Sequence, residues 1–218
     1  MGMLVRSEGT YVDNAAHRLY HAGRSFPCDR EIEALALWHG HALLLSSDTD
    51  CLSLWDGDGL IRTARVGVYP QDMSVSDDTA YICGGADGRL HLLHLPDLSE
   101  SAEYSLPGMP ERVHVRAASA WVLTLLPEQE VCTALLQLDL SAGHSLEITR
   151  FAGIPGALTA DDTGLWIGVS ELVLHLPYGT SKADMVVEGI GLARRILVEN
   201  TGVWVEDSLE ENRVYFRT

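Results

Sequence analysis

The sequence is poor in positive charge and in cysteine, and it contains no long hydrophobic run. Its 218 residues include 15 Lys and Arg against 31 Asp and Glu, which gives a formal net charge of −16. Because phosphate contacts depend on Lys and Arg, this acidic excess argues against nucleic acid as a partner. No segment approaches the roughly 20 apolar residues of a membrane helix, and residues 1–11 are too polar for a secretory signal. We therefore expect a soluble, cytoplasmic protein with no membrane partner.

The four cysteines are far apart in the sequence, at Cys28, Cys51, Cys83 and Cys132. They form no CxxC pair and no short cluster with histidine, which is the spacing that zinc sites use. A disulfide framework is also not expected, because a chain of this length buries a sufficient core and shows no export signal. The cysteines therefore predict small buried thiols, and the sequence predicts no metal and no cofactor.

Similar segments recur at intervals of about 40 residues, and they contain no helical periodicity of useful length. Each has a short apolar strand, a tight polar turn and a second apolar strand, as in residues 73–82, which is typical of a β-hairpin. A third strand and a fourth strand follow before a Gly/Pro pair. One position of each second strand carries a large apolar residue: Leu43, Tyr81, Trp121, Trp166 and Trp204. Such a column indicates four-stranded units that bury their faces against one another.

Parts of these units resemble a known group of repeats. Residues 46–56 and 84–92 look like the end of a WD-repeat blade, and residues 70–76 are similar to the opening of a YVTN-type blade. The resemblance covers nearly the whole chain, but it is architectural. Only one Trp-Asp dipeptide occurs, and the Gly-His dipeptide at Gly40 lies in a hairpin turn. The resemblance implies a β-propeller of the WD-repeat/YVTN-like superfamily, and a fold of this kind does not specify a function.

We predict an all-β fold, a single five-bladed β-propeller of four-stranded antiparallel blades over residues 1–218. The expected segments are 1–26 for closing strands and 27–67, 68–108, 109–153, 154–190 and 191–218 for the blades. Since an open sheet edge pairs with other chains, the last blade needs closure, and residues 17–23 are expected to complete it as a fourth strand. The place of the third strand at this end has two candidates, residues 213–218 and residues 11–16. Residues 11–16 align with a third strand and its turn, and residues 3–11 are an alternative extra edge strand.

The resemblance implies that the first strand of each blade lines a central channel. In that register Asp72, Arg112 and Arg195 lie toward the channel mouth, and His114 lies one layer deeper. Guanidinium groups suit carboxylate or phosphate, so these four residues form the candidate site for a small anionic ligand. The alternative is an internal ion-pair cluster that closes the channel, with His114 as a buried structural histidine. No residue is assigned a catalytic or metal-binding role.

Two functions from different classes fit these observations. The first is a non-catalytic binding or scaffold protein, monomeric or weakly dimeric, that recognises a protein partner or a small anionic ligand on one face. The alternative is a small hydrolase, lactonase or lyase that acts on a sugar or an anion at the channel mouth. That chemistry requires converging carboxylates or a metal, and Asp72 and Glu111 are the carboxylates that the register places there. A sensor or a degenerate enzyme without remaining chemistry is a third possibility.

Overall fold

The computed structural model describes residues 4–7, 9–128, 130–199, 201–207 and 213–217. The regular elements in these ranges are β-strands. The described residues contain no helix with the length and hydrophobicity that a membrane crossing requires. The chain divides into two compact units, Met1–Ala117 and Ala118–Thr218, and each is described by itself.

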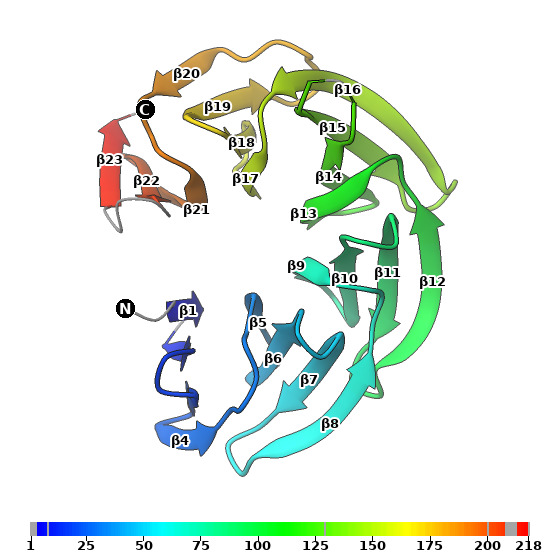
Figure 1. Cartoon of the computed structure of the whole chain (residues 1–218), viewed down its shortest axis with the longest axis vertical. Coiled ribbons are helices and arrows are strands. Elements are labelled where there is room, and N and C mark those ends of the chain that lie inside the picture. The colour runs from blue at the N-terminus through cyan, green and yellow to red at the C-terminus, as the bar shows by residue number, and fades with distance from the viewer. Residues whose placement is uncertain (1–3, 8, 129, 200, 208–212, 218) are drawn as a thin grey trace. The chain divides into compact units, whose positions relative to one another are not determined.

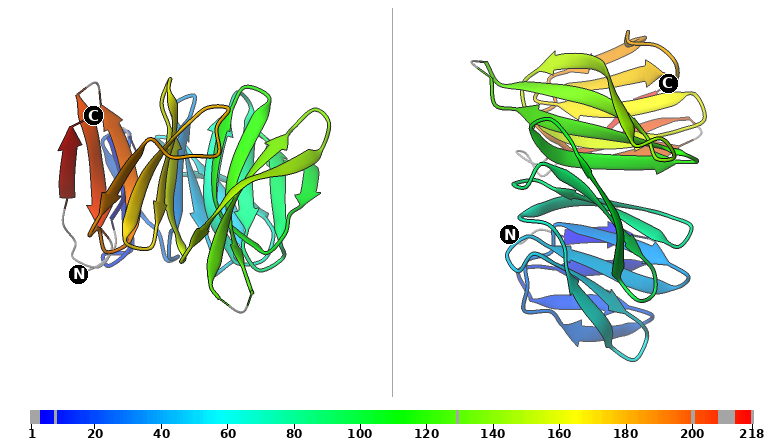
Figure 2. Two further views of the ribbon diagram at one scale, coloured as in Figure 1. Left: turned by 90° about the horizontal axis from the view of Figure 1, so that it is seen from above. Right: turned by 90° about the vertical axis from the view of Figure 1, so that its right-hand side faces the viewer.

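The described strands form six antiparallel sheets in chain order, and Figure 1 labels all of these strands except β2 and β3. Five sheets have four strands and one has three, with the orders β1-β2-β3-β4, β5-β6-β7-β8, β12-β11-β10-β9, β13-β14-β15-β16, β17-β18-β19-β20 and β21-β22-β23. Each sheet is a meander in which consecutive strands are neighbours, and this pattern is also visible from the side in Figure 2. The fold is therefore an all-β β-propeller with six blades, and the predicted number of five blades is wrong.

The first sheet is the one that the sequence analysis missed. Its strands are β1 (Leu4–Ser7), β2 (Thr10–Asp13), β3 (Arg18–His21) and β4 (Arg24–Pro27). Each strand has four residues, and tight turns with a positive φ at Gly9 and Gly23 connect two of the pairs. Because glycine adopts a positive φ without steric cost, such turns are compact. A complete blade consequently fits into a segment much shorter than the repeat of about 40 residues.

The predicted closing strand is also corrected by this sheet. The segment 17–23 does not complete the C-terminal blade, because β3 pairs with β2 on one side and with β4 on the other. The segment 11–16, predicted as a rival third strand of the last blade, and the segment 3–11, predicted as an edge strand, instead contribute β1 and β2 of this first blade. Among the described residues, the C-terminal sheet keeps three strands.

The rest of the first unit contains the second and third sheets and one further strand. The bounds are β5 (Ala34–Trp38), β6 (His41–Ser46), β7 (Cys51–Trp55), β8 (Leu60–Arg65), β9 (Pro70–Ser76), β10 (Thr79–Gly84), β11 (Arg89–His94), β12 (Ser99–Ser105) and β13 (Met109–Arg116). A core cluster joins the second and third sheets, with Leu43, Leu52, Ile82 and Leu93 almost fully buried. Burial of this apolar surface is the main force that holds the sheets together.

The second unit contains the remaining strands. Their bounds are β14 (Ser119–Leu126), β15 (Cys132–Asp139), β16 (His144–Ala152), β17 (Pro155–Ala160), β18 (Gly164–Val169), β19 (Leu172–Pro177), β20 (Met185–Glu188), β21 (Ala193–Glu199), β22 (Gly202–Asp207) and β23 (Arg213–Arg217). Two core clusters lie in this unit. One includes Leu123, Leu135 and Ile167, and the other includes Trp166 and Val203.

The column of large apolar residues occupies the second strands, as the repeat predicts. Leu43 pairs with Ala36, Tyr81 with Ser74, Trp166 with Thr159 and Trp204 with Leu197. Each of these pairs joins the second strand of a sheet to the first strand at the same register. The hairpin repeat read from the sequence is therefore confirmed in these four sheets.

Candidate functional site

Three of the four residues predicted for the ligand site lie in the first unit. Asp72 is on β9, and Arg112 and His114 are on β13. The carboxylate of Asp72 accepts a hydrogen bond from the backbone N–H of Val113 at 3.0 Å, which ties the two strands together. The guanidinium of Arg112 lies 3.8 Å from the Glu111 carboxylate. Asp72, Arg112 and Glu111 therefore form one polar group in this unit.

In this group, the Arg112 guanidinium influences the pKa of two carboxyl groups, those of Asp72 and Glu111. Burial raises the pKa of Asp72, and the Arg112 guanidinium and the Val113 N–H oppose the shift. Burial also raises the pKa of Glu111, with Arg112 opposing and Asp72 adding to the shift. A carboxylate that is removed from water favours its neutral form, and a nearby guanidinium favours the charged form. This group therefore contains two carboxyl groups and one guanidinium group.

His114 and Arg195 have separate surroundings. The His114 ring is half-buried, and burial together with the nearby Arg116 lowers its pKa. The adjacent residue Val115 donates its backbone N–H to Ser74 Oγ at 3.2 Å. Arg195 is on β21 of the second unit, where it is half-buried and pairs in register with Glu206. The joint anion site of Asp72, Arg112, His114 and Arg195 stays a prediction.

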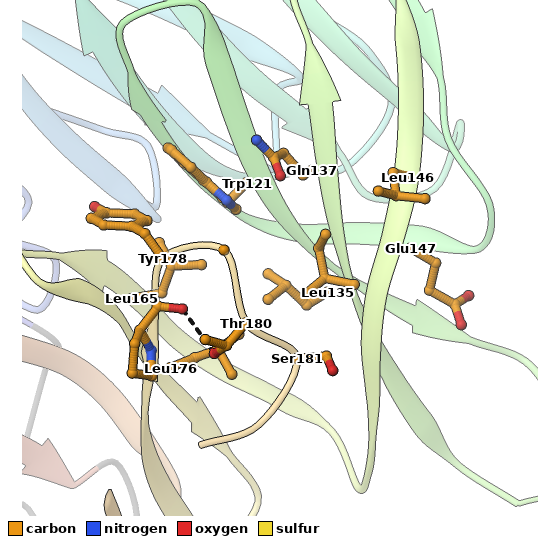
Figure 3. A pocket seen from close by; sticks show the side chains of 13 residues that line it. Trp121, Leu135, Gln137, Leu146, Glu147, Leu165, Leu176, Tyr178, Thr180 and Ser181 are labelled. Atoms are coloured by element: carbon orange, nitrogen blue, oxygen red, sulfur yellow. Dashed lines mark hydrogen bonds between the residues drawn. The ribbon is translucent and has the colours of Figure 1, made fainter. Parts of the chain in front are cut away.

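A cleft of about 490 Å³ lies in the second unit, where the fourth and fifth sheets face each other (Figure 3). Its volume is within the range of small-molecule and peptide side-chain pockets. The lining combines apolar and polar side chains from four elements: Trp121 on β14, Leu135 and Gln137 on β15, Leu146 on β16, and Tyr178 and Thr180 after β19. The loop that follows β19 thus forms one wall, and β16 forms the opposite wall.

Local hydrogen bonds hold the aromatic side of the cleft in place. The Tyr178 hydroxyl donates to the backbone carbonyl of Asp161 at 3.0 Å, and the Thr180 hydroxyl donates to the carbonyl of Pro177 at 3.0 Å. The rings of Trp121 and Tyr178 are tilted by 43° with their centroids 5.5 Å apart. This separation and tilt are favourable for two aromatic rings. The aromatic wall is therefore held in place by contacts within the chain.

The opposite wall exposes an apolar side chain. Leu146 is 64% exposed, the largest exposure among the exposed large hydrophobic residues of the described chain. Beside it, Glu147 is the single carboxylate among the described lining residues, and Arg150 binds it at 2.8 Å and lowers its pKa. The net chemistry of the cleft is consequently apolar and aromatic, with neutral polar groups at Gln137 and Thr180.

A second hollow of about 710 Å³ in the same unit contains a hydrogen-bonded histidine. The His175 ring is 7% exposed, with Nδ1 2.7 Å from Asp184 and Nε2 3.1 Å from the Thr163 hydroxyl. The Thr163 hydroxyl, the His175 imidazole and the Asp184 carboxylate are thus connected in the order that a catalytic triad has. However, the Thr163 hydroxyl donates to Asp161 at 2.6 Å, so its proton is directed away from the imidazole. The network serves to fix the β17–β18 hairpin rather than to activate a nucleophile.

One group of side chains in the third sheet has the composition of a metal site: His91, Glu100 and Glu103. The His91 Nδ1 atom is 2.8 Å from Glu100, and its Nε2 atom is 2.9 Å from Asp87. Glu103 accepts two hydrogen bonds from Arg89, at 2.8 and 2.7 Å. Both ring nitrogens of His91 and the carboxylate of Glu103 thus have partners within the chain. Internal ion pairs account for this group of side chains. The expectation that the protein needs no metal stays a prediction.

Sequence reasoning assigned Trp121 to the core and did not identify the cleft. A partial signal was present, because the turn residues that follow β19 include an aromatic one, Tyr178, between Pro177 and Gly179. Binding residues are often placed on loops that a rigid scaffold positions, and Tyr178 is a half-buried aromatic residue on such a loop. The approach of this loop to β14 and β16 depends on the packing of two sheets, and no local pattern encodes it.

Comparison with known proteins shows the fold. No protein-family model matches the sequence, and no curated protein matches it either. Among solved structures, the computationally designed Ika8 protein has a TM-score of 0.69 at 11% identity, over 100% of this chain and 70% of that chain. BamB from Moraxella catarrhalis has a TM-score of 0.62 at 11% identity, over 98% and 83%. The β-propeller domain of Cps50 (Swd1) from Myceliophteria thermophila has a TM-score of 0.62 at 11% identity, over 82% and 63%.

The chain is a β-propeller. Its resemblance to WD-repeat and YVTN-like propellers, read first from residues 46–56, 70–76 and 84–92, agrees with these neighbours. At 11% identity the likeness concerns the fold alone. Any function must therefore be argued from the surface of this chain.

Proposed function

We propose that this β-propeller is a non-catalytic binding protein that holds an apolar segment of a partner protein in the Trp121–Tyr178 cleft. The observation that carries the proposal is the cleft itself, with an aromatic wall opposite an exposed leucine, Leu146. Aromatic side chains in a partly desolvated pocket provide most of the binding energy in many protein interfaces. The neutral polar groups of Gln137 and Thr180 would orient the backbone of the bound segment.

The other half of the sequence-based hypothesis, a small anionic ligand, has less support in the first unit. There Arg112 lies beside two carboxylates, those of Asp72 and Glu111, so an added anion would meet repulsion as well as attraction. The cleft in the second unit carries no such conflict, because its one carboxylate is bound to Arg150. A protein segment with apolar side chains is therefore the better match.

The test is a selection of peptides from a random display library on the full-length protein, followed by affinity measurement on single variants. Leu146→Glu places a charge in the cleft at a site that is already exposed, so folding should be unaffected. The matched control is Leu60→Glu on β8, where the leucine is 51% exposed. Selected peptides should bind the wild type and Leu60→Glu equally, and bind Leu146→Glu at least about tenfold more weakly.

Two results would contradict the proposal. One is a selection that enriches no apolar or aromatic peptide. The other is a set of peptides that bind Leu146→Glu as tightly as the wild type, because the cleft would then contribute nothing to recognition. Thermal unfolding of both variants by circular dichroism shows whether they are folded, so that a loss of binding is not confused with a loss of structure.

A further inference from the structure

Three side chains that line the Trp121–Tyr178 cleft belong to one row across the fourth sheet. Trp121 on β14 is directly opposite Gln137 on β15, and Gln137 is directly opposite Leu146 on β16. Residues that are opposite each other in a sheet point to the same face, so all three side chains face the cleft, as Figure 3 shows. Because neighbouring strands are about 4.8 Å apart, the row from Trp121 to Leu146 is about 10 Å long.

The row has apolar side chains at its two ends and a polar side chain in the middle. At one end Trp121 is paired with the ring of Tyr178, and at the other end Leu146 is exposed. Between them, the half-buried Gln137 donates to Ser119 Oγ at 3.3 Å. Since an amide has two N–H groups, the second can donate to a ligand. A matching segment therefore has two apolar groups about 10 Å apart with a carbonyl group between them.

We propose that the cleft binds a proline-rich segment of a partner protein in the polyproline II conformation. This inference rests on the proposed function and names the class of segment that the cleft takes. A polyproline II helix has three residues per turn and rises about 3.1 Å per residue, so residues i and i+3 lie on one side about 9 Å apart. Residue i then contacts the rings of Trp121 and Tyr178, and residue i+3 contacts Leu146.

The other regular conformations match this row less well. In a β-strand, side chains on one face are about 7 Å or about 13 Å apart, and neither distance fits. In an α-helix, residues i and i+7 are about 10 Å apart, but the backbone carbonyls between them are paired within the helix and do not accept from Gln137. The carbonyls of a polyproline II segment have no internal hydrogen bonds. Aromatic-lined grooves also bind proline-rich segments in other domains.

The charge of the cleft favours an uncharged segment. Glu147 is the single carboxylate among the described lining residues, and Arg150 compensates it at 2.8 Å. The chain as a whole has a net charge of −16, so acidic residues beside the bound segment would be repelled and basic residues would be attracted. We therefore expect a core of proline and apolar residues with neutral or basic flanks.

The probe is a fluorescein-labelled peptide, Arg-Pro-Leu-Pro-Pro-Leu-Pro-Arg, titrated with the full-length protein and read by fluorescence anisotropy. The matched peptide, Arg-Ala-Leu-Ala-Ala-Leu-Ala-Arg, keeps the leucines and the charge, but it has no proline and favours a helix. The proline peptide should bind at least tenfold more tightly than the alanine peptide. Leu146→Glu should weaken binding of the proline peptide at least tenfold, and the control variant Leu60→Glu should leave it unchanged.

A second variant, Gln137→Leu, separates this inference from the proposed function. It removes the donor and enlarges the apolar lining, so it should weaken binding of the proline peptide about three- to tenfold. Apolar segments that need no donor should bind this variant at least as tightly as the wild type. The matched control is Gln71→Leu, because Gln71 on β9 is also half-buried and does not line the cleft. Circular dichroism shows whether each variant is folded.

The results that overturn the inference differ from those that overturn the proposed function. The inference fails if the alanine peptide binds as tightly as the proline peptide, or if Gln137→Leu binds the proline peptide as the wild type does. It also fails if the proline peptide does not bind at millimolar concentration while apolar peptides from the display library depend on Leu146, and the proposed function then stands. If no peptide of either kind depends on Leu146, both fail.

Discussion

The fifth and sixth sheets share one sequence pattern, but they give the same position two different environments. Both have a tryptophan at the equivalent register of the second strand, Trp166 in β18 and Trp204 in β22. Trp166 is 3% exposed, and every residue of β18 is buried. Trp204 is half-buried, and its ring lies 4.9 Å from that of Tyr215, which is itself exposed on β23.

The difference follows from what covers each sheet. In the fifth sheet, β20 pairs with β19, and the indole N–H of Trp166 donates to Asp161 at 2.7 Å, while the His175 ring lies 4.6 Å away. Trp166 also packs in a core cluster with Val203 and Val205 of the sixth sheet, whereas the Trp204 ring contacts the exposed Tyr215 of its own sheet. A residue that is conspicuous in the repeat is thus a fully packed core residue in one blade and a partly open one in the next. The degree of burial is set by neighbouring elements and not by the repeat.

The largest expected effect is a difference in stability between two tryptophan variants. Trp166→Ala should lower the free energy of unfolding by about 3–5 kcal/mol, because it leaves a cavity in a closely packed site. Trp204→Ala should cost about half as much, since part of its ring is already in contact with water. Urea denaturation followed by circular dichroism measures both values. Equal losses would show that the two sites are equally packed and that the comparison fails.

The next effect concerns Asp161 in the fifth sheet, whose carboxylate accepts the hydrogen bond from the Trp166 indole N–H. Partial burial alone would raise its pKa, but hydrogen bonds from the Thr163 hydroxyl, the Trp166 indole and the backbone N–H groups of Thr163 and Gly164 lower it to about 2. Asp161→Asn should cost about 1–3 kcal/mol at neutral pH, because it weakens these charge-assisted bonds.

The lowered pKa of Asp161 determines how its contribution to stability changes with pH. Since the folded pKa of Asp161 lies below the ordinary value of 3.8, its stabilising contribution is present above pH 4 and is lost as the pH falls toward 2. The stability difference between the wild type and Asp161→Asn should therefore shrink between pH 4 and pH 2. A difference that stays constant over this range would contradict a role for the ionised carboxylate.

The smallest expected effect is a pH dependence of stability in the third sheet, where ion pairs join β11 to its outer strand β12. Burial of the His91 ring opposes its protonation, but hydrogen bonds to Glu100 and Asp87 outweigh this and raise its pKa above the ordinary value of 6.5. Its contribution is therefore full below pH 6.5 and is lost as the pH rises through the folded pKa. Because Glu100 is exposed, the effect should be below about 1 kcal/mol.

The measurement is the melting temperature of the wild type and of His91→Gln at pH 6 and at pH 9. The wild type should be the more stable of the two at pH 6, and the difference should decrease at pH 9. His94→Gln is a matched control, because His94 lies on the same strand and also contacts a carboxylate, that of Asp97 at 3.1 Å, but in a pair that is exposed on both sides. If both variants showed the same pH dependence of the melting temperature, the effect would not be specific to the hydrogen bonds of His91 with Glu100 and Asp87.

Much of the fold could be predicted from local patterns. Alternating apolar residues and turn residues were sufficient to place the hairpins around Leu43, Tyr81, Trp166 and Trp204, because strands and tight turns depend on short-range backbone preferences. The number of blades was not predicted correctly. Strands of four residues in the first sheet carry too few apolar positions for a period to show, so residues 17–23 were misassigned as a closing strand.

The candidate site was less accessible to sequence reasoning. The register of the first strands predicted Asp72 and Arg112 near each other, and Asp72 accepts a hydrogen bond from the N–H of Val113, next to Arg112, whose charge opposes the raised pKa of Asp72. Their role in a ligand site stays a prediction. The cleft was missed, because Trp121 and Tyr178 are separated by more than one repeat and meet only when two sheets pack together.

The sequence by itself determined the secondary structure, the antiparallel pairing of neighbouring strands and the column of large residues that the sheets bury. These features follow from side-chain alternation and turn preferences, which act over a few residues. The tertiary structure decided which tryptophan is enclosed, which loop forms the wall of a cleft and that residues 4–27 form a blade of their own. These depend on contacts between segments far apart in the chain, where packing and the removal of water, rather than local geometry, control the energy.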